Sequence, residues 1–205
     1  MNFIPKNRSS IVKEYLVISM LYFIILGIYT FPLIVNFGTS FIGEGDAHIF
    51  IFNAFNFHEN ISNGESPFYT KFLLHPEGES MLMHTSTLTM SAFSSLFSNQ
   101  LLGVNLFIIL SFVVSGVGAY ILANQFFKNK LYAFVCGFIF AFSSYKTARL
   151  LGHYNLLLTA TIPFCIYYFL LIVEQSNELR NFSKVQIKTY LAFLFVFQFQ
   201  LIVFV

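Results

Sequence analysis

The sequence predicts an all-α membrane protein, a polytopic helix bundle with about five transmembrane helices in a single membrane domain. Hydrophobic residues make up 57% of its 205 residues and charged residues only 10%, where a soluble domain has about 25% charged residues. The mean hydropathy is +0.72. The net charge of +2 is small and the basic residues are scattered among short loops, which argues against nucleic acid as a partner.

The predicted transmembrane helices follow from stretches of mostly apolar residues. A bilayer core of about 30 Å needs about 20 such residues in a helix. Four stretches reach that length, and a shorter one, 131–145, is an unbroken apolar run. The five predicted spans are 15–37, 104–127, 131–145, 154–173 and 187–205. The last run reaches Val205 without a polar tail, so we expect a chain truncated at its C-terminus.

The long connection 38–103 is predicted to be an external loop with two interfacial or re-entrant helices, 47–61 and 84–98. The second of these segments mixes hydroxyl and apolar side chains. If it does not cross the membrane, eight of the eleven basic residues fall on one side, as the positive-inside rule favours. The N-terminus is then cytoplasmic. These eight residues are Lys6, Arg8, Lys13, Lys128, Lys130, Arg180, Lys184 and Lys188.

Two predicted spans carry small side chains at every fourth position, the spacing that lets neighbouring helices approach closely. We expect these stripes to be packing surfaces. They comprise Ser111, Ser115, Ala119 and Ala123 in one helix and Ala133, Gly137 and Ala141 in the next.

Asp46 is the only aspartate of the chain, and it follows the first span together with Glu44. Two interpretations remain open. The carboxylate of Asp46 suits the first turn of the predicted helix 47–61, where it would cap the helix. Alternatively, Glu44 and Asp46 act in catalysis, as a base for a hydroxyl acceptor or as ligands of a divalent cation. The sequence does not choose between these roles, and the cofactor stays unknown.

A second polar cluster follows the third span and contains Lys146, Arg149 and His153. These cations would lie outside, against the positive-inside trend, and an anionic phosphate of a lipid-linked substrate would hold them there. The alternative is ordinary anchoring by side chains that reach the membrane interface. All five histidines fall on the external side, so His75 and His84 are further site candidates.

The order of several short motifs resembles the N-terminal part of integral-membrane glycosyltransferases of the GT-C superfamily, especially bacterial mannosyltransferase-like and YfhO-like proteins. The motifs are Gly-Glu-Gly-Asp-Ala at 43–47, Ser-Pro-Phe-Tyr-Thr at 66–70, His-Pro-Glu-Gly-Glu-Ser at 75–80, Gly-Ala-Tyr-Ile-Leu-Ala at 118–123, Gly-Phe-Ile-Phe-Ala-Phe-Ser-Ser-Tyr at 137–145 and Ala-Arg-Leu-Leu-Gly-His-Tyr-Asn at 148–155.

This resemblance implies a transferase that moves a sugar from a polyprenyl-phosphate donor to a cell-envelope acceptor, on the external face of the bacterial plasma membrane. It makes Asp46 the leading catalytic candidate and Glu44 its companion, and it assigns the donor phosphate to Lys146, Arg149 or His153. The competing function is a membrane scaffold or transporter-like protein without enzymatic activity, or an inactive fragment. A transporter would be expected to place charged residues near the bilayer midplane, and the predicted spans place none there.

Overall fold

The computed structural model describes residues 8–82, 88–178, 187 and 189–194. The described chain is mostly helical, and four of its helical segments are long and apolar enough to cross a membrane, which indicates a membrane protein. They are Ser9–Tyr29, Gln100–Ala123, Lys130–Leu150 and Tyr154–Glu174. The predicted fifth span, 187–205, lies largely outside the described residues, although residues 187 and 189–194 are helical.

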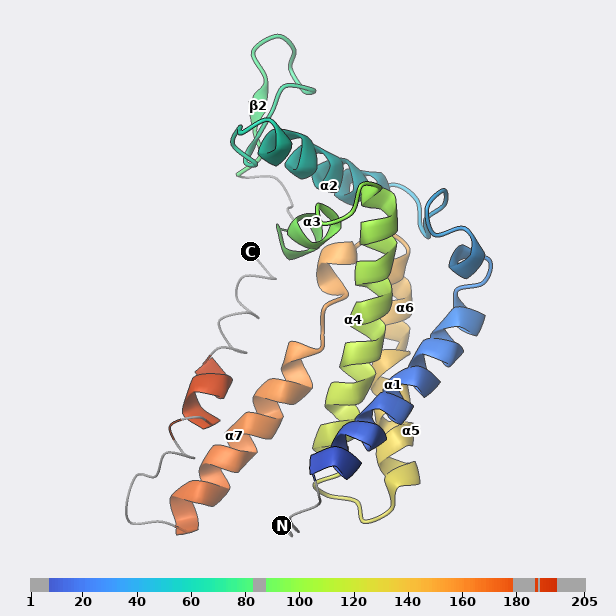
Figure 1. The fold of residues 1–205 in the computed structure, drawn as a ribbon, viewed down its shortest axis with the longest axis vertical. Helices are drawn as coiled ribbons and strands as arrows, with labels where there is room; N and C mark the ends of the chain where they lie inside the picture. Colours follow the sequence, from blue (N-terminus) through green and yellow to red (C-terminus); the bar gives the residue numbers. More distant parts are fainter. Residues whose placement is uncertain (1–7, 83–87, 179–186, 188, 195–205) are drawn as a thin grey trace. The chain divides into compact units, whose positions relative to one another are not determined.

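The helices of the structure divide between two compact units (Figure 1). Of the described residues, unit 1 contains 8–26, 111–143 and those from 158 to 194, and unit 2 contains those within 27–110 and 144–157. Helices α1 (Arg8–Tyr29) and α4 (Gln100–Ala123) contribute to both units. Unit 1 also holds α5 (Lys130–Ala141) and α7 (Thr161–Glu178).

Unit 1 is built around Tyr22 of α1, which is fully buried. Its hydroxyl donates a hydrogen bond to the carbonyl of Phe134 at 2.9 Å, and its ring stacks on that of Phe134 with centroids 4.9 Å apart. Gly116 of α4 and Gly137 of α5 make room for it, because a Cβ added at either position would meet the tyrosine at 2.9 Å or less. Glycines at these two positions let three helices pack around one aromatic side chain.

The stripes of small residues are packing surfaces, as the sequence predicts, since all seven residues are buried. A Cβ added at Gly137 would lie 2.6 Å from the carbonyl oxygen of Gly116, which shows how closely α4 and α5 approach. At the end of unit 1 nearest Lys130, Glu14 accepts hydrogen bonds from the Tyr120 hydroxyl and the Lys130 ammonium, each at 2.6 Å.

Unit 2 contains α2 (Ala47–Ser62), the 3-10 turn η1 (Leu33–Val35), the strands β1 (Tyr69–Thr70) and β2 (Glu79–Ser80), and α3 (Leu88–Ser94). The strands pair antiparallel, Tyr69 opposite Ser80, in a short hairpin that the sequence analysis assigns to loop. Helix α6 (Ser144–Leu150) and the 3-10 turn η2 (Tyr154–Leu156) complete the unit.

A helix is predicted over 47–61, and α2 (Ala47–Ser62) confirms the helix, with bounds that agree to within a residue. The predicted helix 84–98 is shorter, since α3 has seven residues and residues 83–87 lie outside the described chain. Seven residues span about 10 Å, far less than the membrane thickness. A helix of this length agrees with the expectation that this segment does not cross.

Two predicted spans are interrupted in the structure. The helix predicted over 131–145 is α5, which ends at Ala141 and is followed directly by α6. The span predicted over 154–173 begins instead with η2, and its regular helix α7 starts at Thr161. Pro163 suits the first turn of α7, where its missing N–H leaves no hydrogen bond unmade.

We predict that Gly137→Ala destabilises the protein by about 1–3 kcal/mol, the typical cost of inserting a methyl group into a packed interior. The added methyl would collide with Tyr22 and with the Gly116 backbone. Thermal unfolding in detergent measures the change. The control is Val135→Ala on the same helix, where the side chain is exposed. An unfolding temperature of Gly137→Ala equal to that of the control would contradict this packing.

Candidate functional site

The candidate site lies in unit 2, where the connection between α1 and α2 meets the turn after α6. The backbone N–H of Glu44 donates a hydrogen bond to the Leu151 carbonyl at 3.0 Å. The hydroxyl of Tyr154 donates to the carbonyl of Ile42. The buried ring of Tyr154 also stacks on Phe50 of α2, with centroids 5.6 Å apart. These contacts join two segments that are far apart in the sequence.

Gly43 permits this contact because no other residue fits its position. Its φ of +113° is a backbone conformation that side-chain-bearing residues rarely adopt. A Cβ at Gly43 would lie 2.6 Å from the Leu151 oxygen, well inside van der Waals contact. Gly152 on the opposite segment is buried, and a Cβ there would lie 3.3 Å from the Glu44 oxygen. The two backbones therefore touch directly.

The contact brings together the two polar clusters of the sequence. The Oδ2 atom of Asp46 lies 3.9 Å from the Nε2 atom of His153. Both side chains are about half exposed, at 58% for Asp46 and 49% for His153, so water and polar ligands reach them. An exposed pair of this kind contributes little to folding stability. Both groups are therefore open to a ligand, at little cost to folding stability.

Asp46 occupies the N-cap position of α2, as predicted, but its side chain makes no capping hydrogen bond. The interpretation of Asp46 as a hydrogen-bonding cap therefore does not account for this residue. The positive end of the α2 dipole still favours a carboxylate at this position. The carboxylate is held near the start of the helix and remains open to the surroundings.

The remaining candidates lie in different environments. Glu44 is exposed beside Asp46 and is fixed through its backbone. Arg149, near the end of α6, is partly buried, with its guanidinium carbon 5.3 Å from the centre of the Tyr145 ring. Lys146 is 1% exposed, within the candidate span Lys130–Leu150. His75 is exposed between the hairpin strands, and His84 lies outside the described residues.

The sequence reasoning missed the side chains that hold the site in place. Tyr154 was not singled out, although it follows His153 directly and contacts both Ile42 and Phe50. His48 was noted only as one of five histidines. Its Nδ1 atom lies 3.2 Å from the Gly45 carbonyl, and its ring packs edge-on against Phe41. Gly43 and Gly45, on either side of Glu44, were the features of the sequence that could have indicated the close backbone contact with Leu151.

Asn99, directly before α4, and Asn105, within α4, hold residues 37–40 of the connection between α1 and α2. Asn105 is fully buried, and its Nδ2 atom donates to the carbonyls of Phe37 and Ser40, each at 2.7 Å. The Nδ2 atom of Asn99 donates to the Gly38 carbonyl at 3.0 Å. The connection that carries Glu44 and Asp46 is thus fixed by α4 at one end and by Leu151 and Tyr154 at the other.

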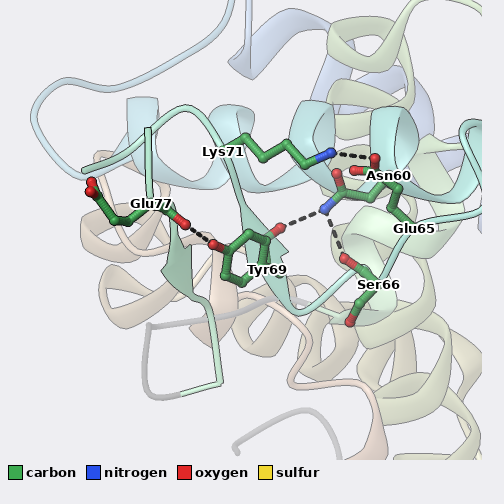
Figure 2. A network of polar contacts seen from close by, with 6 residues as sticks. All are labelled: Asn60, Glu65, Ser66, Tyr69, Lys71 and Glu77. Atoms are coloured by element: carbon green, nitrogen blue, oxygen red, sulfur yellow. Dashed lines mark hydrogen bonds and ion pairs between the residues drawn. The ribbon is translucent and has the colours of Figure 1, made fainter. Parts of the chain in front are cut away.

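Asn56 and Asn60 of α2 face the segment 64–80, which contains the β1–β2 hairpin. The amide of buried Asn60 donates to the carbonyls of Ser66 and Tyr69, and Asn56 donates to the Tyr69 carbonyl as well. Figure 2 shows the hydrogen bonds of Asn60 together with the Lys71–Glu65 ion pair and the hydrogen bond from the Tyr69 hydroxyl to the Glu77 carbonyl. These asparagines therefore bind backbone within the protein.

Within the described part of the chain, no group of three or more histidine, cysteine, aspartate or glutamate side chains is placed to hold a metal ion. Asp46 and His153 offer two donor atoms close together. A divalent cation at Asp46 would have to complete its coordination with water or with oxygens of a substrate phosphate.

The chain was compared with protein-family models, with curated proteins and with solved structures, and none of the three comparisons finds a match. The residues of this site are therefore the basis for inferring a function.

We predict that Gly43→Ala speeds hydrogen exchange of the Glu44 amide by about tenfold or more, which corresponds to a loss of about 1.4 kcal/mol of local stability. The methyl group would push the connection away from Leu151 and break the hydrogen bond that protects this amide. Exchange of peptides covering 42–48, followed by mass spectrometry, measures it.

The matched control is Gly45→Ala. Gly45 also has a positive φ, of +55°, but an added Cβ there meets no atom within 4 Å. The control therefore carries a positive-φ cost, smaller at +55° than at +113°, without the collision. Equal exchange in the two variants would show that the contact with Leu151 does not fix the loop.

Proposed function

We propose that the chain acts as a GT-C-type membrane glycosyltransferase, moving a sugar from a polyprenyl-phosphate donor to a hydroxyl of a cell-envelope acceptor. The observation that carries the proposal is the exposed Asp46–His153 pair, held at 3.9 Å by a backbone contact between two loops that adjoin apolar helices. A carboxylate beside an imidazole is a common arrangement for general base catalysis.

In the proposed reaction Asp46 accepts the proton of the acceptor hydroxyl while the hydroxyl oxygen attacks the anomeric carbon of the donor sugar. The bond between that carbon and the phosphate oxygen breaks, and polyprenyl phosphate leaves with the bonding electrons. The Arg149 guanidinium and the His153 imidazole, both on the α6 side of the contact, would donate hydrogen bonds to the leaving phosphate. Glu44 would assist in binding the acceptor or a cation.

The proposed location is the external face of the bacterial plasma membrane, with the N-terminus in the cytoplasm. The loop before α2 and the turn after α6 touch, so both lie on the same side of the membrane. Counting the candidate spans along the chain also puts these two loops on one side, provided that α3 does not cross the membrane. The positive-inside rule favours the external face for that side.

The proposal predicts that Asp46→Asn lowers sugar transfer by about a hundredfold or more, the usual contribution of a general base. Asparagine keeps the shape of the side chain and loses its basicity. The assay uses the full chain in vesicles with a radiolabelled hexose on polyprenyl phosphate and an acceptor glycan, and membrane insertion is checked in parallel.

The matched control is Glu79→Gln, which removes an exposed carboxylate from β2 and should leave transfer unchanged. Transfer by Asp46→Asn at the rate of the unmodified chain would remove Asp46 from the reaction and with it the proposed mechanism.

A scaffold for envelope assembly is the second candidate, and the hairpin segment favours it. The turn between β1 and β2 exposes the side chains of Phe72 and Leu74, at 56% and 68%. The contacts of Figure 2 hold the two ends of this turn in place. An ordered apolar tip of this kind is typical of a protein contact.

Complementation of a deletion strain separates the two functions. A scaffold would lose complementation with Leu74→Asp and keep it with Asp46→Asn, because a charge at the tip disrupts an apolar contact and leaves the site untouched. A transferase gives the opposite pattern. The matched control is Leu74→Met, which keeps the tip apolar and should complement in either case.

A further inference from the structure

An apolar surface lies where the turn between β1 and β2 meets α2. The ring of Phe72 packs against the rings of Phe52 and Phe55 of α2, with centroids 6.3 and 5.5 Å apart. Phe55, Phe72, Leu73 and Leu74 are nevertheless exposed. We call these side chains, with Phe52, the hairpin surface. The ring contacts make this surface continuous across the helix and the turn.

The turn holds its most exposed apolar side chain in a fixed place. Leu74 has a φ of +48°, a backbone conformation that a bulky residue rarely adopts. Its carbonyl accepts a hydrogen bond from the N–H of Gly78 at 3.1 Å. Gly78 has no room for a side chain, because a Cβ there would lie 2.5 Å from the Thr70 carbonyl oxygen. Since the turn is already ordered, a partner binds it without first having to fix its shape.

Two carboxylates border the hairpin surface. Glu59 lies one turn after Phe55 on the same face of α2, since residues four apart in a helix are neighbours. Figure 2 shows the carboxylate of Glu77 pointing away from the rest of the network. The one lysine between these two glutamates is held in an ion pair by a third glutamate. Residues 59–77 therefore carry a formal charge of −2, where the whole chain carries +2.

The bilayer does not suit this surface as a partner. Within unit 2, the hairpin extends from α2 on the side away from α4 (Figure 1), and α4 is a candidate membrane span. The hairpin surface therefore lies beyond the end of α4, outside the hydrocarbon layer that this helix is long enough to cross. Its negative charge would also be repelled by anionic lipid headgroups.

We propose that the hairpin surface docks a segment of a partner protein in which apolar side chains alternate with lysine or arginine. The apolar side chains pack on the rings and on Leu74, and the cations pair with Glu59 and Glu77. An apolar centre with a polar rim is the usual composition of a protein interface. The inference rests on the second candidate function, the scaffold, and deepens it by naming the chemistry of the partner.

The absence of tryptophan from the chain allows a direct test. Leu73→Trp places a single fluorescent reporter in the hairpin surface. The full chain is reconstituted in nanodiscs of phosphatidylcholine, and two short peptides are added in turn. Leucine alternates with lysine in one peptide and with glutamate in the other. Both peptides carry a nitroxide, which quenches tryptophan on contact.

The lysine peptide should quench the reporter saturably and bind about tenfold more tightly than the glutamate peptide, because like charges across an interface are unfavourable. Glu59→Gln together with Glu77→Gln should reduce this preference to about twofold, since both bordering carboxylates are then neutral.

The apolar contribution is tested at Leu74. Leu74→Asn should weaken binding of the lysine peptide about fivefold, because it removes an exposed apolar contact. Asparagine tolerates a positive φ, so the turn keeps its shape. The matched control is Leu74→Met, which keeps the side chain apolar and should bind the peptide as the reporter chain does.

Equal binding of the two peptides would overturn the proposal, as would binding that Leu74→Asn leaves unchanged. Nanodiscs of brominated phosphatidylcholine should leave the reporter unquenched, and strong quenching would show instead that the bilayer covers this surface. Sugar transfer does not enter these measurements. A chain that loses complementation with Leu74→Asp but shows no preference for the lysine peptide would keep the scaffold function and lose the basic partner.

Discussion

The direct contact between the backbones at Glu44 and Leu151 is the constraint on which the arrangement of the site depends. It requires a glycine at position 43, because a Cβ would meet the Leu151 oxygen at 2.6 Å. It also places the first residues of α2 beside the turn after α6 and so brings Asp46 to His153. Without it, the two polar clusters would be separate features of two loops, and neither would suggest a site.

The surroundings of this contact combine a rigid frame with an accessible surface. Asn99 and Asn105 fix the connection on one side, and Tyr154 fixes it on the other. The charged groups of the loop are nevertheless half exposed. Exposed charges are common at catalytic loops held by a rigid scaffold. The substrate must reach the charged groups, and the scaffold must hold these groups in a fixed geometry.

Much of the fold could be predicted because apolar length and the spacing of small residues are local signals. The spans around α1 and α4, the helix α2 and the close approach at Gly137 followed from such signals. The interruptions after Ala141 and before Thr161 could not be predicted in the same way, since Ser143 and Thr159 break runs that stay apolar on average. The hairpin of β1 and β2 was missed because strands of two residues leave no periodic pattern.

The site could be predicted in part. Asp46, Glu44 and His153 were identified from their residue types and places along the chain, and the structure brings Asp46 and His153 together. The burial of Lys146 and the supporting roles of Tyr154 and Asn105 could not be predicted, because each depends on packing between distant segments. The function itself remains a proposal from the chemistry of the pair.

The account is tested most directly by cross-linking the two loops. In a chain with Cys136→Ala and Cys165→Ala, the substitutions Asp46→Cys and His153→Cys place two thiols where the structure has the carboxylate and the imidazole. A short bismaleimide should then join them within one chain in native membranes, as seen by mass spectrometry of the linked peptides. Absence of this cross-link, when each single cysteine reacts readily with a simple maleimide, would contradict the contact and the site built on it.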